Sequence, residues 1–191
     1  NCGTVGFLLN EITDEDLKLR INKASTQCIP KLSMSAIDAH GEQLNACVFN
    51  DVYFNRMTHQ AAKLTIEINS KKRIENFSGD GLIISTEMGS TAYNRSAGGP
   101  IIPLGSNLTA LTPICGFTPR HWRGALIHGN DLIKITNNDP SKRPISVVAV
   151  SKEFKNIQEV SINSVENYFA SLMFDSDSSL HEKILNEQFY G

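Results

Sequence analysis

The sequence of 191 residues lacks the features that would direct it to a membrane or to nucleic acid. No stretch approaches the ~18 to 20 consecutive apolar residues that a membrane-spanning helix needs. The formal net charge is −2, so the chain has no general attraction for nucleic acid or for an anionic membrane surface. We therefore expect no nucleic-acid partner and no membrane partner.

Several catalytic and metal-binding motifs are also missing. The four cysteines at positions 2, 28, 47 and 115 form no CxxC pair, and the five histidines show no metal-ligand spacing. Neither a GxSxG elbow nor a GxxxxGK[ST] phosphate loop occurs. A zinc site, a serine hydrolase and a P-loop enzyme are not predicted, and the cysteines are expected to be reduced, buried or semi-buried thiols of a cytoplasmic protein.

Helical patterns occur near both ends. The hydroxyl and carboxylates of Thr13–Asp16 predict a helix start. The helix is expected to end near Thr26, with one apolar face formed by Leu17, Ile21 and Ala24. A second helix is expected at Ser179–Gln188.

Between these ends the hydrophobic period changes to two, which is typical of strands. The expected strands include Leu32–Ala36, Ala46–Val48, Val52–Phe54, Leu64–Ile68, Leu82–Ile84, Leu132–Ile135, Ile145–Val150 and Val160–Ile162. Leu82–Ile84 should be buried on both faces. Leu132–Ile135 and Ile145–Val150 are expected to pair through the turn residues Asn137–Pro140. A strand-rich sandwich or prism is predicted for residues 29 to 165.

The segment Gly79–Pro100 contains the strongest functional pattern, GDGLIISTEMGSTAYNRSAGGP. Asp80 lies between glycines, where its carboxylate can accept hydrogen bonds from ribose hydroxyls or an amide; the alternative is a turn aspartate before a strand. Ser90 or Thr91 is expected to cap a short helix that runs to about Ser96. Tyr93 is expected to stack on a base, or else to be a core tyrosine. Residues 97–100 indicate a helix stop, with the alternative that they pass backbone beside a ligand.

Two further clusters have both a functional and a structural interpretation. Asn50 can pair with an adenine edge and Asp51 with a ribose, although a strand-start turn explains both residues locally. The sequence Arg120–Arg123 combines cations with Trp122, and it predicts either anion recognition or an exposed loop anchored by the tryptophan.

In combination, these segments resemble the NAD kinase family, whose members phosphorylate NAD to NADP. The similarity covers nearly the whole chain, and its motifs occur in the family's order. They are Asn1–Leu9, Phe49–Asp51, Gly79–Pro100, Leu111–Cys115 and Ile184–Phe189.

The resemblance implies an α+β fold in which a mainly-β, sandwich-like C-terminal domain binds the dinucleotide. The expected division is residues 1–28 as the end of an N-terminal α/β domain, 29–165 as the NAD-binding domain, and 166–191 as a tail and helix that pack back on the first domain. The resemblance also implies ATP and a divalent cation such as Mg²⁺, NAD as the acceptor, and a homodimer or homotetramer.

The family's binding roles transfer to nine positions of this chain. Asn50 would contact adenine, Asp51 a ribose, and Asp80 the nicotinamide end. The adenosine pocket would be lined by Thr91, Ala92 and Tyr93, and its wall completed by Asn94, Arg95 and Ser96.

The sequence departs from the family at several positions. Glu87-Met88 replaces a proline and a small residue, so it is expected to add a charge near the acidic site and to alter the adenine contacts. Ser78 stands where many members have a basic residue. No Gly-Gly-Asp-Gly motif occurs, and the chain begins at Asn1 rather than Met. We expect an upstream segment to supply the catalytic base, and the 191 residues alone to bind NAD weakly without catalysis.

Two alternatives remain on sequence grounds. A related lipid kinase of the diacylglycerol kinase type would share the fold but should lack the Gly89–Tyr93 adenosine wall. A non-catalytic dinucleotide sensor is compatible with Glu87-Met88 and with the missing acidic loop.

Overall fold

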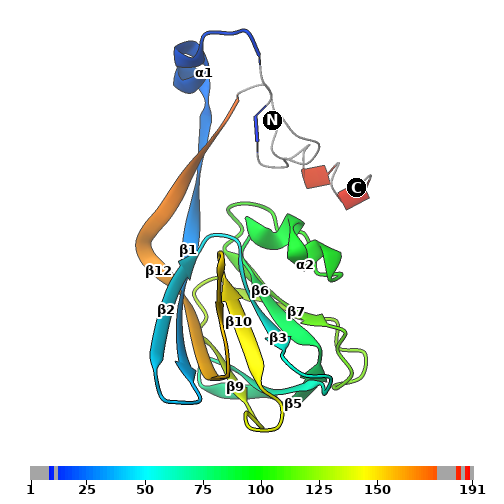
Figure 1. Ribbon diagram of the computed structural model, residues 1–191. Coiled ribbons are helices and arrows are strands. Elements are labelled where there is room, and N and C mark those ends of the chain that lie inside the picture. The colour runs from blue at the N-terminus through cyan, green and yellow to red at the C-terminus, as the bar shows by residue number, and fades with distance from the viewer. Residues whose placement is uncertain (1–8, 11–12, 176–183, 186–187, 190–191) are drawn as a thin grey trace.

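Two six-stranded antiparallel sheets pack face to face in the computed structural model, which describes residues 9–10, 13–175, 184–185 and 188–189 (Figure 1). The first sheet has the order β2 (Gln43–Val48), β1 (Ser25–Asp38), β12 (Ile157–Phe174), β9 (Ile133–Asn137), β4 (Ala62–Ile68) and β5 (Lys71–Gly79). The second has the order β11 (Lys152–Phe154), β10 (Ile145–Ala149), β3 (Asp51–Arg56), β6 (Gly81–Ser85), β7 (Leu108–Ile114) and β8 (Ala125–His128). The predicted sandwich-like, mainly-β fold is confirmed.

The alternating apolar residues of the sequence form the core between the sheets. Leu32 and Met34 of β1 and Leu64 and Ile66 of β4 are buried on the first sheet, and they belong to the same core cluster as Phe54 of β3 in the second sheet. β6 is buried along its whole length, as predicted, because it lies between β3 and β7 and contacts the short helix α2 (Tyr93–Ser96). Each fully buried aliphatic side chain of this kind contributes about 1.5–3 kcal/mol to the free energy of unfolding.

The predicted hairpin between Leu132–Ile135 and Ile145–Val150 is wrong. β9 pairs with β12 and β4 in the first sheet, whereas β10 pairs with β3 and β11 in the second. The connection crosses between the sheets, and the Asn138 N–H donates to the Lys63 carbonyl at 2.9 Å. Both strands bury their apolar side chains in the same core, so a turn pattern between them fits a hairpin and a sheet-to-sheet crossing equally well.

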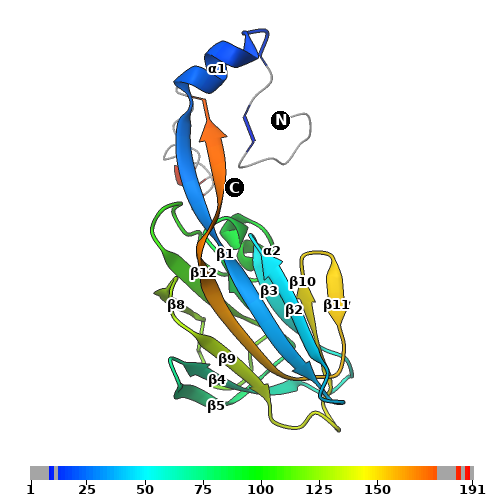
Figure 2. The same ribbon diagram turned by 90° about the vertical axis from the view of Figure 1, so that its left-hand side faces the viewer.

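Strands β1 and β12 extend beyond the sandwich as a two-stranded arm that carries helix α1 (Leu17–Lys23) at its end (Figures 1 and 2). The helix ends at Lys23, earlier than the expected Thr26, because Ala24 is already extended and Ser25 begins β1. Asp16 caps the helix, and its carboxylate accepts a hydrogen bond from the Lys18 N–H at 2.9 Å.

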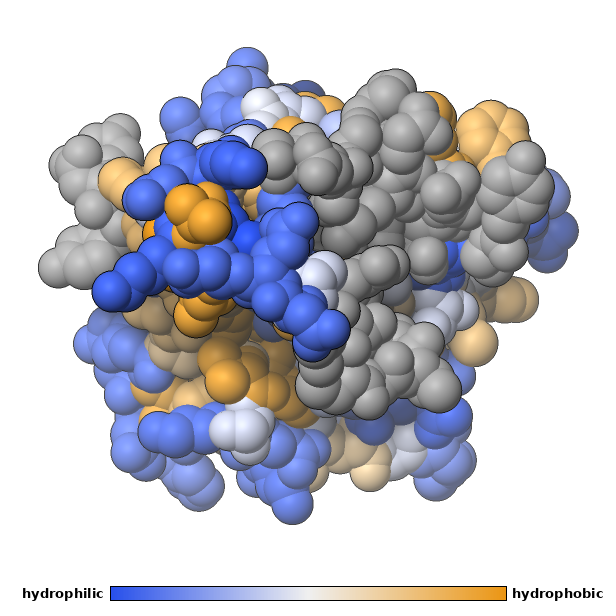
Figure 3. Space-filling view, turned by 90° about the horizontal axis from the view of Figure 1, so that it is seen from above, coloured by the Kyte–Doolittle hydropathy of each residue, from blue (hydrophilic) through white to orange (hydrophobic). Residues whose placement is uncertain are grey.

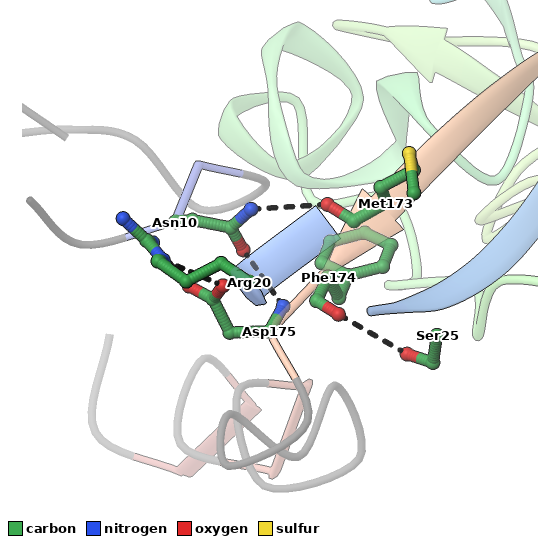
Figure 4. A network of polar contacts seen from close by, with 6 residues as sticks. All are labelled: Asn10, Arg20, Ser25, Met173, Phe174 and Asp175. Carbon is green, nitrogen blue, oxygen red and sulfur yellow. Dashed lines mark hydrogen bonds and ion pairs between the residues drawn. The ribbon is translucent and has the colours of Figure 1, made fainter. Parts of the chain in front are cut away.

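Polar contacts tie α1 to the end of β12 (Figure 4). The Arg20 guanidinium donates from Nε and Nη2 to the two carboxylate oxygens of Asp175 at 3.0 and 2.6 Å. The Asn10 amide donates to the Met173 carbonyl at 3.0 Å.

The space-filling view from this end shows hydrophobic surface among hydrophilic groups (Figure 3). The side chains of Leu17, Leu19 and Phe169 are all more than half exposed.

The expected domain boundaries fall inside these long strands. β1 continues through position 28/29 and β12 through position 165/166, without a break in pairing between the arm and the sandwich apart from one irregularity in register after Pro30. The three-part division of the chain stays a prediction. Most of the predicted helix Ser179–Gln188, and most of Asn1–Leu9, lie outside the described residues.

The remaining sequence expectations have mixed outcomes. Cys28, Cys47 and Cys115 are free thiols, but all three are exposed rather than buried, and Cys2 lies outside the described residues. Trp122 anchors its loop, since its ring meets that of Phe77 edge-on at a centroid distance of 5.9 Å. No helix within the described part of the chain combines the length and apolarity needed to cross a membrane.

Candidate functional site

Strand β3 forms the base of the candidate site. Its period of two places Val52 and Phe54 in the core, with no exposed surface, and turns Asp51, Tyr53 and Asn55 to the opposite face. At about 3.3 Å per residue, Asp51 and Asn55 are about 13 Å apart along the strand. That face therefore presents polar and aromatic groups over a length suited to an extended ligand.

An open groove of about 810 Å³ lies beside this face of β3. Its lining comes from four strands, helix α2 and the loops between them: Asn55, Arg56, Met57, Thr58, His59, Asp80, Tyr93, Ile114, Ser146, Glu153 and Lys155. The groove thus brings together Asp80 and Tyr93, two of the residues that the sequence singled out, although they are 13 positions apart in the chain.

Tyr93 covers the middle of β3. Its ring meets the Tyr53 ring edge-on, with centroids 5.2 Å apart and planes at 86°. Tyr93 is 38% exposed, which excludes the alternative of a core tyrosine and leaves part of its ring open to a ligand. Burial raises the pKa of the Tyr93 hydroxyl, and nearby Tyr53, Cys115 and Asp51 add to this. Burial also raises the pKa of Asp51.

Asp80 lies at the far end of the groove and is held from both its backbone and its side chain. Arg56 Nε donates to the Asp80 carboxylate at 2.6 Å, and the Arg56 N–H donates to the Asp80 carbonyl at 2.9 Å. The following Gly81 is required by close packing, because a Cβ there would lie 1.9 Å from the Phe54 carbonyl oxygen. Asp80 is therefore a fixed carboxylate with a cationic neighbour.

The segment after β6 forms a wall beside β3, which we call the acceptor wall (residues 88–96). It consists of a 3₁₀ turn, η1 (Gly89–Thr91), followed by α2. The predicted capping role of Ser90 or Thr91 is wrong: the cap residue of α2 is Ala92, which makes no side-chain hydrogen bond to the helix. The helix ends as predicted, with Gly98 in the left-handed region at φ 83°.

Within the wall, the side chains of Ser90 and Asn94 point toward the protein interior and not toward solvent. Both are fully buried. The Asn94 amide donates to the carbonyls of Ser90 and Pro100 at 3.1 and 2.8 Å, and its oxygen accepts from the Thr112 hydroxyl at 2.6 Å. The Ser90 hydroxyl accepts from the Ile102 N–H at 3.0 Å. The expectation that Asn94 lines the pocket is therefore corrected: its polar atoms are used within the chain.

The other predicted wall residues lie nearer the surface. Ala92 and Ser96 are exposed, and Thr91 and Arg95 are half-buried. These four residues keep their predicted roles as ligand contacts.

Asn50 joins the wall through its backbone. Its carbonyl accepts from the Thr86 N–H and hydroxyl, each at 2.9 Å, while its side chain belongs to an exposed residue. A Cβ at Gly89 would lie 2.3 Å from the Asn50 carbonyl oxygen, so glycine permits this close approach. The structure thus places Asn50-Asp51 next to the start of the wall, as a shared binding site requires.

Glu87 does not add a charge near Asp80, contrary to the sequence expectation. Its side chain points away into the loop after α2 and is 4% exposed. The carboxylate accepts from the Gly105 N–H at 2.6 Å, from the Ser106 hydroxyl at 3.3 Å and from the Asn107 N–H. Its hydrogen bonds are therefore structural contacts below the wall.

Arg56, Tyr53, Asn55 and Lys155 are candidate binding residues that sequence reasoning did not single out. The period of two from Asp51 could have identified Tyr53 and Asn55, because alternate residues of a strand share a face. No local pattern marks Arg56 or Lys155. Their place in the groove depends on how β3 and the segment after β11 lie beside Asp80.

The described residues contain no group of three or more His, Cys, Asp or Glu side chains placed to hold a metal ion. Asp80 and Asp51 lie at opposite ends of β3 and do not form a common carboxylate site. The donor set of the described residues therefore does not fit a resident divalent cation.

The sandwich and its wall define a class of protein, the C-terminal domains of ATP-NAD kinases, and residues 49–171 match that domain family. The chain is 43% identical to the NAD kinase of Xylella fastidiosa over 187 residues, which are 98% of this chain and 72% of that protein. It is 39% identical to the NAD kinase of Rickettsia felis over 191 residues, covering 75% of the relative. The chain belongs to the NAD kinase family.

Solved structures have the same fold. The yeast NADH kinase complexed with NADH matches with a TM-score of 0.74 at 19% identity, over 88% of this chain and 50% of that one. An NAD kinase from Archaeoglobus fulgidus in complex with ATP matches with a TM-score of 0.73 at 20% identity, over 94% of this chain and 68% of that one. At these identities the similarity establishes the fold, and this chain spans half the length of the yeast protein.

Proposed function

We propose that the protein is an NAD kinase, which transfers the γ-phosphoryl group of ATP to the 2′-hydroxyl of the adenosine ribose of NAD. In this reaction the described residues bind and orient the acceptor. The observation that carries the proposal is the groove beside β3 that is lined by both Asp80 and Tyr93, in a chain of the NAD kinase family. Asn50-Asp51 lies at the start of the same strand. No observation favours the lipid kinase or the sensor.

The positions of the residues along β3 and in the groove beside it support an order of contacts. Asn50 and Asp51 would take the adenine edge and a ribose, and Tyr93 would stack on the base. Asp80 lies beside Arg56, five residues and about 17 Å along β3 from Asp51, and would contact the nicotinamide end. Arg56 and Lys155 line the groove near Asp80 and would face the diphosphate between the two nucleosides. Guanidinium and ammonium groups are the side chains that bind phosphate oxygens.

Acceptor orientation makes a large contribution to a reaction of this kind. Phosphoryl transfer depends mainly on placing the attacking hydroxyl in line with the phosphorus and on stabilising charge. Asp51 would fix the ribose through a hydrogen bond, and the wall would fix the base, so that the 2′-hydroxyl is presented in one orientation. ATP is the phosphoryl donor, and a divalent cation would enter with its phosphates.

The proposal keeps three further sequence expectations. The base that deprotonates the 2′-hydroxyl is expected in a Gly-Gly-Asp-Gly loop, which these residues do not contain. A homodimer or homotetramer is expected, in which neighbouring subunits add to the NAD site. The free, exposed thiols Cys28, Cys47 and Cys115 support a reducing, cytoplasmic location.

The test is NADP formation by the whole natural protein with ATP, Mg²⁺ and NAD, compared with a Tyr93→Ala variant. We expect NADP to form, and the variant to bind NAD more weakly by ~1–3 kcal/mol if the ring stacks on adenine. Tyr93→Phe is the matched control, because it keeps the ring and should keep most of the affinity. Failure of the natural protein to phosphorylate NAD would refute the function, whereas equal affinity in all three proteins would refute only the stacking role.

A further inference from the structure

Glu87 is a charged residue with almost no exposed surface, and it lies directly before the acceptor wall. Its side chain leaves the end of the β6 segment and enters the loop Leu104–Asn107. An ionised carboxylate is costly to bury unless hydrogen bonds replace its hydration. Here the Gly105 and Asn107 N–H groups and the Ser106 hydroxyl supply them. Hydrogen bonds to an ionised acceptor are about twice as strong as neutral ones.

The same residue is also fixed through its backbone. The Glu87 carbonyl accepts from the Ser90 hydroxyl at 2.8 Å and from the Ser90 N–H at 3.4 Å. The Ser90 hydroxyl in turn accepts from the Ile102 N–H. Glu87 therefore connects the first turn of the wall, through its carbonyl, to the loop, through its carboxylate.

The loop is itself held against the base of the β1–β12 arm. Gly105 has φ 84°, and a Cβ on it would lie 2.8 Å from Nε2 of Gln27 on β1. The Asn107 carbonyl accepts from the Gly129 N–H at 2.7 Å, which fixes the other end of the loop to the segment after β8. The loop that supplies the donors to the Glu87 carboxylate is therefore itself in contact with β1 and with the segment after β8.

We propose that Glu87 is a positioning residue that holds the acceptor wall in its binding conformation by fixing it to the Leu104–Asn107 loop. The proposal rests on the proposed function, in which the wall receives the adenosine of NAD. Glu87 acts through residues 88–93 and does not touch the ligand. Fixing the start of η1 helps to place the wall residues that would contact adenosine, because Ala92 and Tyr93 follow it without a side-chain cap. The hydrogen bonds of Asn94 hold the other end of the same segment.

Glu87→Gln in the whole natural protein tests this role with little change in volume. Glutamine keeps one acceptor oxygen, but its NH₂ group would face an N–H donor of Gly105 or Asn107, so at least one hydrogen bond is lost. We expect the KM for NAD to rise about tenfold while kcat changes less than twofold, since a displaced wall weakens acceptor binding. Hydrogen exchange should speed up at the Gly105 and Asn107 amides and at the wall amides Ala92 and Ser96.

Three further variants separate positioning from general stability. Glu42→Gln makes the same chemical change at an exposed residue between β1 and β2 and should alter neither readout. Ile133→Val thins the core in the first sheet, and it should lower the Tm without changing the KM for NAD. Ser106→Ala removes one of the three donors at an exposed loop residue, so it should raise the KM in the same direction but by less, and it serves if Glu87→Gln does not fold.

The outcomes distinguish the two proposals. If the natural protein makes no NADP, the proposed function fails, while faster exchange at both the loop and the wall in Glu87→Gln still supports the structural coupling. If the natural protein makes NADP and Glu87→Gln loosens only the loop, with the KM for NAD unchanged, the positioning role is refuted. Unchanged hydrogen exchange at the Gly105 and Asn107 amides in Glu87→Gln would also refute the positioning role of Glu87.

Discussion

The acceptor wall and the β1–β12 arm lie at the same end of the sandwich and are built in opposite ways (Figure 1). The wall and the two residues before it bury polar side chains: Thr86, Glu87, Ser90 and Asn94 are at most 4% exposed, and each is hydrogen-bonded within the chain. Helix α1 buries none of its residues, and Leu17, Leu19 and Phe169 of the helix and arm are more than half exposed, although Phe174 at the end of β12 is buried.

This difference indicates which side chains contribute to the stability of each region. A buried polar network is strongly specified, because every unmade hydrogen bond there costs the desolvation of the group. An exposed apolar side chain contributes little to the free energy of unfolding, since folding does not remove it from water. Substitutions in the wall should therefore have large effects on this chain, and substitutions on α1 small ones.

Among substitutions in the wall, the largest effect is expected for Asn94→Ala. It leaves the Ser90 and Pro100 carbonyls and the Thr112 hydroxyl without the amide partner that they have now. We expect the free energy of unfolding to fall by about 2–4 kcal/mol, measured by urea denaturation. Asn45→Ala, at an exposed position of β2, should stay within about 0.5 kcal/mol. A loss below 1 kcal/mol for Asn94→Ala would contradict the role of this network.

Gly89→Ala tests the contact between the wall and Asn50. The added methyl would meet the backbone of Asn50 at 2.3 Å, which a side-chain rotation cannot relieve. We expect a loss of about 1–3 kcal/mol in stability, together with weaker NAD binding measured by calorimetry. Gly41→Ala is the control: its Cβ would meet nothing within 4 Å, so its strained φ of 82° costs stability without affecting NAD. Equal NAD affinity in Gly89→Ala and Gly41→Ala would show that the contact of Gly89 with Asn50 does not contribute to NAD binding.

Asp51 and Asp38 should respond to pH in opposite directions. Burial raises the pKa of Asp51 in the folded state, so its ionised form costs stability above that pKa and the cost disappears below the unfolded value. Asp51→Asn should therefore be more stable than the natural protein at neutral pH, with a difference that shrinks toward pH ~3–4. The same variant should bind NAD more weakly.

Asp38 is the matched comparison. Hydrogen bonds from the Glu42 and His40 N–H groups lower its pKa, so its charge stabilises the fold above the unfolded pKa and that contribution is lost as the pH falls. Asp38→Asn should be less stable at neutral pH, again with a shrinking difference in acid. Urea titrations at several pH values measure both variants, and the same sign for the two would contradict this assignment.

A smaller effect on stability is expected for Arg56→Gln, which breaks the ion pair with Asp80. Both side chains are more than a third exposed, so solvent limits the loss to about 0–1 kcal/mol. Lys134→Gln breaks a similarly exposed pair with Glu159 in the first sheet. Arg56→Gln also removes the 2.6 Å hydrogen bond from Arg56 to the Thr58 carbonyl, so it should cost at least as much stability as Lys134→Gln. Only Arg56→Gln should change NAD affinity. Equal NAD affinities would show that Arg56 is not part of the site.

The smallest effect is expected on α1. Leu19 is 57% exposed, so Leu19→Gln should change the free energy of unfolding of this chain by less than about 0.5 kcal/mol. Leu64→Ala in the core is the contrasting variant and should cost about 2–5 kcal/mol. A loss above 1 kcal/mol for Leu19→Gln would show that this side chain is buried in the folded protein. The helix α1 and the wall would then not differ in the way described above.

The sequence predicted the strands well because burial on a strand follows a period of two, which is local information. Leu64–Ile68 and Leu82–Ile84 were both identified as strands, and the buried faces of β6 were anticipated. The pairing of β9 and β10 could not be predicted in the same way. Partner choice depends on which backbone lies alongside each strand, and the apolar pattern is the same for either pairing.

In the candidate site, too, local motifs could be predicted from the sequence and tertiary contacts could not. Asp80 and Tyr93 were identified from a local motif, and the groove brings them together as expected. The inward direction of Asn94 and Glu87 was not foreseen, because a polar residue in a binding motif reads the same whether it faces a ligand or a carbonyl of its own chain. Arg56 was missed since its partner Asp80 lies 24 positions away.

The sequence by itself determined the alternating core, the family membership carried by Gly79–Pro100 and the residue types of the acceptor site. These depend on side-chain chemistry and on spacing along the chain. Only the tertiary structure decided that β9 and β10 belong to different sheets, that Asn94 and Glu87 support the wall from beneath, and that Arg56 pairs with Asp80. Those outcomes depend on which distant groups meet, because a buried donor or acceptor must find its partner wherever the fold brings one.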